Sequence, residues 1–154
     1  MKACSFLCES SDALKNALLA HKENNFQPNL ALVFCSSSQN LDEIRAIFTA
    51  EGIDLAGCTT AGEIVDAGLH AKSIAVMLLS LDRAYYQVLL EKYDGEDVGP
   101  AAERLGKQAA ATFANPSGII LSGGLTVDAE LIIESIYSGA EINLPMYGGM
   151  AGDD

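Results

Sequence analysis

Four segments rich in small residues follow the apolar runs of this sequence, and their chemistry suits ligand binding. They are Ser36–Ser38, Gly57–Glu63, Ser122–Thr126 and Gly148–Asp154. Small side chains let a ligand approach the backbone, and successive amide N–H groups can form a concave site for an anion. Thr59 and Thr60 add hydroxyl donors, while Glu63 and Asp153 add carboxylates that can hold an ammonium group. Together the segments predict a site for a zwitterion such as an amino acid.

These segments are expected to meet, because ligands of open α/β sheets bind beyond the carboxyl ends of the strands. The predicted site residues are Cys35, Ser36, Gly57, Cys58, Thr59, Thr60, Ala61, Gly62, Glu63, Gly148, Gly149, Ala151, Gly152 and Asp153. For any one segment alone, a tight turn is the more common explanation of its glycines. Gly106-Lys107 lacks the other residues of a P-loop, and no Gly-x-Gly-x-x-Gly occurs, so we predict no nucleotide and no cofactor.

Cysteine chemistry is the main alternative. Cys35 and Cys58 each stand at a predicted strand end, where a nucleophile could be exposed. A working thiolate needs a lowered pKa and usually a nearby histidine, but His21 and His70 are better explained as surface or structural residues. We therefore predict no catalytic residue. A cysteine-dependent enzyme, or a redox switch between Cys35 and Cys58 on adjacent strands, remains the competing hypothesis.

Metal binding is a weaker alternative. Oxygen and nitrogen ligands could come from Glu63, Asp66, His70, Asp153 and Asp154. Their spacing matches no EF-hand, and surplus carboxylates commonly serve solubility alone. We predict no metal site.

Composition excludes several classes of partner. The 154 residues include 21 acidic and 9 basic side chains, a net charge of −12, so nucleic acid and anionic membrane surfaces are disfavoured. The longest apolar run, Ile74–Leu79, is too short to span a membrane. Because Glu9 interrupts the only apolar stretch near the start, no secretory signal is predicted. The expected location is the cytosol, with reduced cysteines.

The elements that position these residues alternate between strand and helix. Apolar runs predict strands over residues 3–8, 30–35, 54–58, 73–81, 84–93 and 118–121, with another beginning at Met146. Helical spacing predicts helices over 12–23, 41–51, 98–113 and 128–137. This order predicts an α/β fold with a mixed, largely parallel sheet and helices on both faces. The runs 73–81 and 84–93, joined at Asp82-Arg83, predict one antiparallel hairpin. No internal repeat is evident.

One known family combines these motifs. The segment Gly57–Ile64, preceded by Leu32–Ser36 and followed by Gly148–Asp154, resembles the N-terminal domain of FIST (F-box and intracellular signal transduction) proteins. The similarity covers nearly the whole chain. Members are proposed to be sensory domains that bind small molecules, amino acids among them, and are often followed by a FIST C-terminal domain. The resemblance thus implies that residues 1–154 form a single, truncated N-terminal sensory domain without the C-terminal domain.

The predicted function is therefore a non-catalytic, ligand-binding sensor in signal transduction. Its expected partners are a small molecule such as an amino acid, and a FIST C-terminal domain or a downstream signalling protein. Tyrosines 85, 86 and 93 in the predicted hairpin could also join a homodimer. A pure dimerisation or interaction scaffold is the further alternative.

Overall fold

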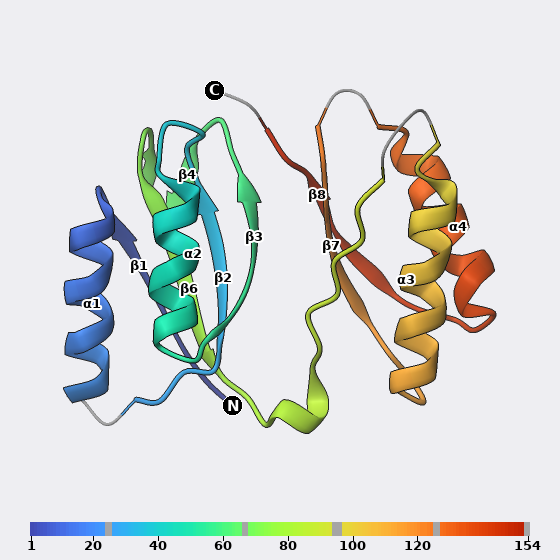
Figure 1. The fold of residues 1–154 in the computed structure, drawn as a ribbon, viewed down its shortest axis with the longest axis horizontal. Helices are drawn as coiled ribbons and strands as arrows, with labels where there is room; N and C mark the ends of the chain where they lie inside the picture. Colours follow the sequence, from blue (N-terminus) through green and yellow to red (C-terminus); the bar gives the residue numbers. More distant parts are fainter. Residues whose placement is uncertain (24–25, 66–67, 94–96, 125–126, 153–154) are drawn as a thin grey trace. The chain divides into compact units, whose positions relative to one another are not determined.

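The computed structural model describes residues 1–23, 26–65, 68–93, 97–124 and 127–152. The chain divides into two compact units (Figure 1). Unit 1 comprises Met1–Val88 together with the chain end from Gly152, and unit 2 comprises Leu89–Ala151. None of the helices in the described part of the chain has the length and apolar character needed to cross a membrane. The assignment of residues 1–154 to a single domain stays a prediction.

Unit 1 is built on a four-stranded sheet with the order β1-β6-β2-β3. Its strands are β1 (Lys2–Cys8), β2 (Leu30–Cys35), β3 (Asp54–Thr59) and β6 (Ile74–Ser80). Helix α1 (Ser11–Glu23) connects β1 to β2, and helix α2 (Leu41–Ala50) connects β2 to β3. A two-stranded antiparallel sheet, β4 (Glu63–Val65) and β5 (Gly68–His70), precedes β6, and a short 3-10 helix, η1 (Arg83–Tyr85), follows it.

The core of unit 1 lies between one face of this sheet and both helices. Its buried side chains are Leu14 and Leu18 of α1, Ile44, Ile47 and Phe48 of α2, and Ala31, Val33 and Cys35 of β2, with apolar residues of β6. Both connections move across the sheet in the same direction, from β1 to β2 to β3, so right-handed crossovers place both helices on the same face. The prediction of helices on both faces is therefore wrong for this sheet.

The mixed α/β class is confirmed, but the sheet of unit 1 is not largely parallel. Only β2 and β3 pair in parallel, whereas β6 runs antiparallel to both β1 and β2. Strand β3 ends at the same end of the sheet at which β6 begins, and only the short β4 and β5 separate them along the chain. Because no helix carries the chain back to the opposite end of the sheet, β6 must run in the direction opposite to β2.

The predicted hairpin over residues 73–93 is wrong beyond its first strand. Residues 74–80 form β6, but the described residues 84–93 contain no strand. Strand β6 lies between β1 and β2, so both of its edges already carry partners. The Asp82-Arg83 pair does not close a hairpin turn. Asp82 instead caps η1, where its Oδ1 accepts a hydrogen bond from the Ala84 N–H at 2.9 Å.

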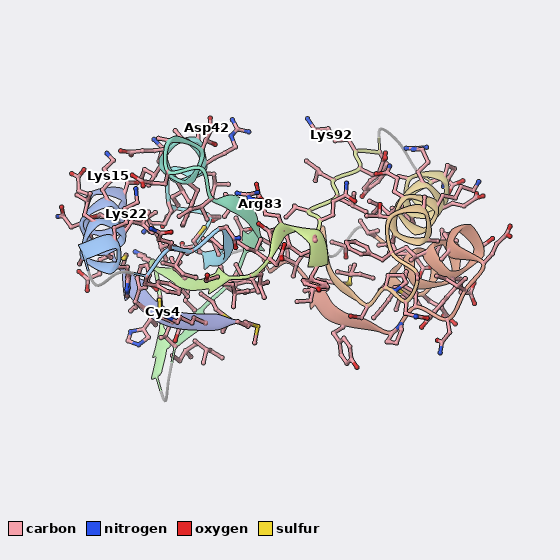
Figure 2. The ribbon with its side chains drawn as sticks, turned by 90° about the horizontal axis from the view of Figure 1, so that it is seen from below. Cys4, Lys15, Lys22, Asp42, Arg83 and Lys92 are labelled. Carbon is pink, nitrogen blue, oxygen red and sulfur yellow. The ribbon has the colours of Figure 1, made fainter. Side chains whose placement is uncertain are left out.

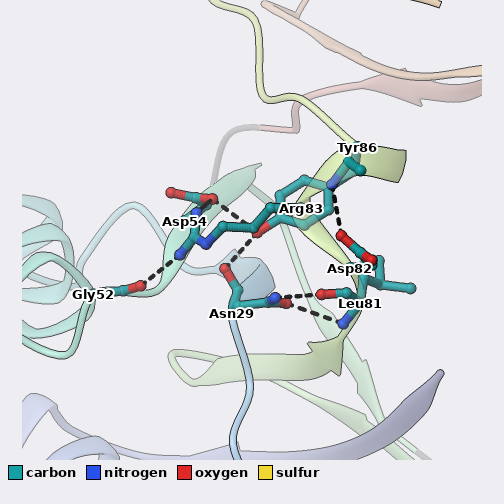
Figure 3. A network of polar contacts seen from close by, with 8 residues as sticks. Asn29, Gly52, Asp54, Leu81, Asp82, Arg83 and Tyr86 are labelled. Carbon is teal, nitrogen blue, oxygen red and sulfur yellow. Dashed lines mark hydrogen bonds and ion pairs between the residues drawn. The ribbon is translucent and has the colours of Figure 1, made fainter.

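A polar network then holds the chain at the start of β3 (Figure 3). Arg83 forms an ion pair with Asp54 and donates to the Gly52 carbonyl at 2.9 Å. The Tyr86 hydroxyl lies 2.8 Å from Asp54 Oδ2 and 2.9 Å from the Asn29 carbonyl oxygen. Burial and the neighbouring carboxylate raise the pKa of Tyr86. These side-chain contacts tie the segment after β6 to Asn29, to Gly52 and to the first residue of β3, in place of the backbone pairing that a hairpin would make.

Unit 2 contains two helices and a parallel pair of strands. They are α3 (Gly99–Thr112), β7 (Gly118–Ser122), α4 (Ala129–Ala140) and β8 (Met146–Met150). The core lies between the helices and one face of the strands, with Ala102, Ile132 and Ile136 buried and Ile120 packed against them. On the opposite face Ile119 is 63% exposed, so the core of unit 2 covers only one face of β7.

Candidate functional site

The carboxyl ends of β2 and β3 bring the first two predicted segments together. Parallel pairing places Cys35 opposite Thr59, and the Thr60 N–H donates to the Cys35 carbonyl at 2.9 Å. Gly57 and Cys58 lie within β3, as the predicted strand over residues 54–58 requires, and the strand extends one residue further, to Thr59. Gly57 is required at its position, because a Cβ there would stand 1.9 Å from the Val33 carbonyl oxygen. The glycine thus lets the two strands approach closely.

Glu63 is enclosed and fully engaged by protein donors. Its side chain is 1% exposed. Oε1 accepts from the Thr60 hydroxyl at 2.9 Å, and Oε2 accepts from the Ser73 hydroxyl at 2.7 Å and from the Ser73 N–H at 3.0 Å. These hydrogen bonds tie the end of β3 to the start of β6. The geometry supports a structural role for this carboxylate, while the predicted contact with a ligand stays a prediction.

Ser36 has a similar enclosed position at the end of β2. Its hydroxyl lies 2.8 Å from the Ser38 hydroxyl and accepts from the Ser38 N–H at 3.2 Å. Its own N–H donates to the Ser73 carbonyl at 3.1 Å. Ser36 therefore shapes the turn after β2 and links it to the start of β6.

The last predicted segment is divided between the two units. Gly152 belongs to unit 1, where a Cβ on it would stand 3.1 Å from the Ala61 nitrogen and 3.8 Å from the Thr60 Cα. Gly148 and Gly149 lie within β8 of unit 2, not in a turn, and Ala151 follows that strand. Asp153 lies outside the described residues. A site shared by β3 with Gly148, Gly149 and Ala151 stays a prediction. Gly62, of the second predicted segment, lies in the short connection between β3 and β4.

A groove of about 400 Å³ runs between α2 and β3. We call it the α2–β3 groove; it is lined by Val33, Cys35, Leu41, Asp42, Ile44, Arg45, Leu55, Gly57, Cys58 and Thr59. Four predicted site residues (Cys35, Gly57, Cys58 and Thr59) therefore line one cavity. Its walls are largely apolar side chains from β2, α2 and β3.

Two charged residues on α2 line the same groove, and the sequence analysis did not identify them. The Arg45 Nη2 donates to Asp42 Oδ1 at 2.8 Å, and their side chains are 72% and 87% exposed. Figure 2 shows Asp42 on the outer side of its helix. Opposite charges three residues apart are common on solvated helix faces, so their spacing does not point to a ligand site. Only the position of α2 beside β3 does so.

The thiols do not form a reactive pair. Burial raises the pKa of the Cys58 thiol, which keeps it protonated at neutral pH and opposes a nucleophilic role. Cys35 pairs with Thr59 and Cys58 pairs with Phe34, so the two cysteines are one position apart in register. Side chains at successive positions point to opposite faces of a sheet, which opposes a disulfide between them.

Thiol chemistry assisted by a histidine and metal binding are the remaining chemical alternatives, and the described residues do not support either of them. His21 lies 3.8 Å from the Cys4 thiol, but burial raises the pKa of that thiol as well. Among the residues that the structure describes, no three His, Cys, Asp or Glu side chains are grouped to hold a metal ion. Of the predicted oxygen ligands, Asp66, Asp153 and Asp154 lie outside those residues.

Comparison with known proteins identifies one family. A family model for the FIST N domain matches residues 29–154. No curated protein and no solved structure matches the chain. The matched region includes β2, α2 and β3, and therefore every residue that lines the groove.

Proposed function

Because the chain belongs to the FIST N domain family, whose members are generally sensory domains in signal transduction, we propose that it is a non-catalytic sensor that binds a small metabolite in the α2–β3 groove. The observation that carries the proposal is the lining of this groove, an apolar cavity with one pair of opposite charges and the Thr59 hydroxyl. Ligand pockets are typically of about 300–1,000 Å³, mostly apolar, with a few polar groups that orient the ligand.

An amino acid with an aliphatic side chain fits this lining best. Its carboxylate would take two hydrogen bonds from the Arg45 guanidinium, and its ammonium group would contact the Asp42 carboxylate. The ligand would thereby replace the ion pair between these two residues. Its side chain would lie against Val33, Ile44 and Leu55, which supply apolar surface from three elements.

The signal would leave the groove through the end of β3. Thr60 follows the groove residue Thr59 and is tied through Glu63 to Ser73 at the start of β6. Gly152 lies against Thr60 and Ala61. A ligand that favours one position of the β3 end would therefore bias the segment that continues from Gly152, where a FIST C-terminal domain or a downstream signalling protein would read the change. None of the four cysteines, all of which lie among the described residues, forms a disulfide, which is in keeping with a cytosolic location.

Calorimetry with the common amino acids tests the proposal on the full chain. We expect an aliphatic amino acid to bind, and Arg45→Gln to weaken that binding about tenfold, because a charge-assisted hydrogen bond contributes about 1.5–3 kcal/mol. The matched control is Arg104→Gln, which removes a half-exposed arginine of α3 from its ion pair with Glu91; Arg104 does not line the groove. The proposal fails if no amino acid binds, or if both variants weaken binding equally.

A further inference from the structure

The helices and the first strand of unit 2 follow those of unit 1 at one constant interval. The first residues of α1 and α3 are 11 and 99, those of β2 and β7 are 30 and 118, and those of α2 and α4 are 41 and 129. Each pair is separated by 88 residues. In both units a helix, a strand, a second helix and a parallel partner strand follow one another in this order. Such agreement in order and spacing is the pattern of a duplicated structural unit.

The buried helical positions agree at the same interval. In the first helices Leu14 corresponds to Ala102 and Leu18 to Gly106, and all four are buried. In the second helices Ile44 corresponds to Ile132 and Phe48 to Ile136, again all buried. Even the helix caps coincide, because Asn40 and Asp128 both accept hydrogen bonds from the first turn with their side chains. The core positions are thus the same, although most of the residue types differ.

The parallel strand pairs share a close approach at one glycine. A Cβ on Gly57 would stand 1.9 Å from the Val33 carbonyl oxygen, and a Cβ on Gly148 would stand 1.9 Å from that of Ile120. Gly148 also has a φ of +141°, which strongly favours glycine. The close approaches therefore align Val33 with Ile120 and Gly57 with Gly148, at intervals of 87 and 91 residues, so the strand residues are shifted by one and by three positions from the interval of 88 that the helices keep.

This alignment places two cavities at the same position in the two units. Unit 2 has a cavity of about 260 Å³, the α4–β8 pocket, which is lined by Ile120, Ser122, Ala129, Ile132, Ile133, Met146, Tyr147, Gly148, Gly149 and Met150. Ile120, Ser122 and Ile132 occupy the positions of Val33, Cys35 and Ile44 in the α2–β3 groove. The two glycines occupy the positions of Gly57 and Cys58.

We infer that the chain is an internal duplication whose second unit carries its own ligand site, the α4–β8 pocket, and that this site takes a small, uncharged, apolar molecule. Ile133 stands where the first groove has Arg45, and the described residues that line the pocket carry no charge. Ile133 and Met150 are 43% and 41% exposed, so their apolar surface is open to a ligand. A charged ligand would lose its hydration there without gaining a partner.

The volume of the pocket further restricts which ligands can fit. At about 260 Å³ it is smaller than the α2–β3 groove, which suits one small aromatic ring system or a branched aliphatic molecule. The Ser122 hydroxyl and the backbone of Gly148 and Gly149 offer a few polar contacts. The inference rests on the equivalence of this pocket to the α2–β3 groove, and thus on the function proposed for that groove, and it goes beyond that function because it assigns a second site, with a different class of ligand, to unit 2.

Indole is a suitable probe, since it is neutral, aromatic and small. We expect a titration of the ¹⁵N-labelled full chain to shift the amide signals of Gly148 and Gly149 saturably. Ile133→Arg, which installs the side chain of the equivalent position, should weaken binding about tenfold or more, because it puts a charge into an apolar wall. Ala129→Leu, which installs the equivalent Leu41 side chain, should weaken binding by filling the cavity while it keeps the wall apolar.

The matched control is Ile119→Arg, which places the same charge on the exposed, opposite face of β7 and should leave indole binding unchanged. The same spectra show whether each variant keeps its fold. The inference is overturned if Gly148 and Gly149 do not shift, or if Ile119→Arg weakens binding as much as Ile133→Arg. Shifts at Gly57 and Cys58 alone would overturn it too, while leaving the function proposed for the α2–β3 groove intact.

Discussion

At the scale of single residues, Glu63 connects three segments from an enclosed position. Its two carboxylate oxygens accept three hydrogen bonds from Thr60 and Ser73. The residue itself begins β4, so the end of β3, the start of β4 and the start of β6 depend on one side chain. Hydrogen bonds to a charged group are the stronger kind, and buried donors left without a partner are costly.

Glu63→Ala should lower the free energy of unfolding by about 3 kcal/mol or more, because it leaves the Ser73 N–H and hydroxyl unpaired and opens a cavity. Urea denaturation measures the change. Glu43→Ala is the control: this exposed glutamate pairs with Lys15, and its removal should cost less than about 1 kcal/mol. Equal losses in the two variants would contradict the structural role of Glu63.

A second residue-scale feature is the pair Asp42 and Arg45. Their type and spacing are those of an ordinary surface ion pair, and nothing in the local sequence distinguishes them. They line the groove because Ile44 of the same helix packs into the core and so turns that side of α2 toward β3. The role of such residues follows from the neighbour that the helix meets.

At the scale of elements, the helices and most strands agree with their sequence-based predictions. Continuous apolar residues predict β2 and β6, and helical spacing predicts all four helices to within a few residues at their ends. The short strands β4 and β5 were not predicted, since three residues hold too little pattern. Residues 84–93 have the composition of a strand, but β6, the strand with which they were predicted to pair, already has partners on both sides.

The contact between β2 and β3 depends on Gly57, which leads to a prediction at this scale. Gly57→Ala should lower the free energy of unfolding by about 2–4 kcal/mol, because its Cβ must push apart two paired backbones. Gly149→Ala is the control in the other parallel pair, where no atom lies within 4 Å of the added Cβ. It should leave stability unchanged or raise it by about 0.5 kcal/mol. If Gly57→Ala is as stable as Gly149→Ala, the close approach is not real.

At the scale of the whole molecule, the dominant electrostatic feature is a net charge of −12. Like charges repel across the compact state, and salt screens this repulsion. The melting temperature should therefore rise by several degrees between about 0.01 M and about 0.2 M NaCl, as thermal denaturation would measure. Glu134→Lys, on an exposed part of α4, removes two units of negative charge and should reduce the rise. A melting temperature that falls with salt would show that the surface ion pairs outweigh the repulsion.

The inferred duplication also belongs to this scale. The sequence shows no repeat because the two units have diverged in residue type. Corresponding core positions carry different residues, such as Leu18 and Gly106 or Phe48 and Ile136. Packing requires only that each position be apolar and that the volumes of facing positions be complementary. The architecture can therefore be retained while sequence similarity between the units is lost.

The sequence by itself determined the α/β class, most element boundaries and the family. These depend on composition, on periodicity within some 5 to 15 residues and on local motifs, all of which are present in the unfolded chain. Only the tertiary structure decided the direction of β6, the enclosure of Glu63, the charged pair beside β3 and the equivalence of the two cavities. Each of these is a relation between residues far apart in the chain, and such relations exist only after strands have paired and helices have packed.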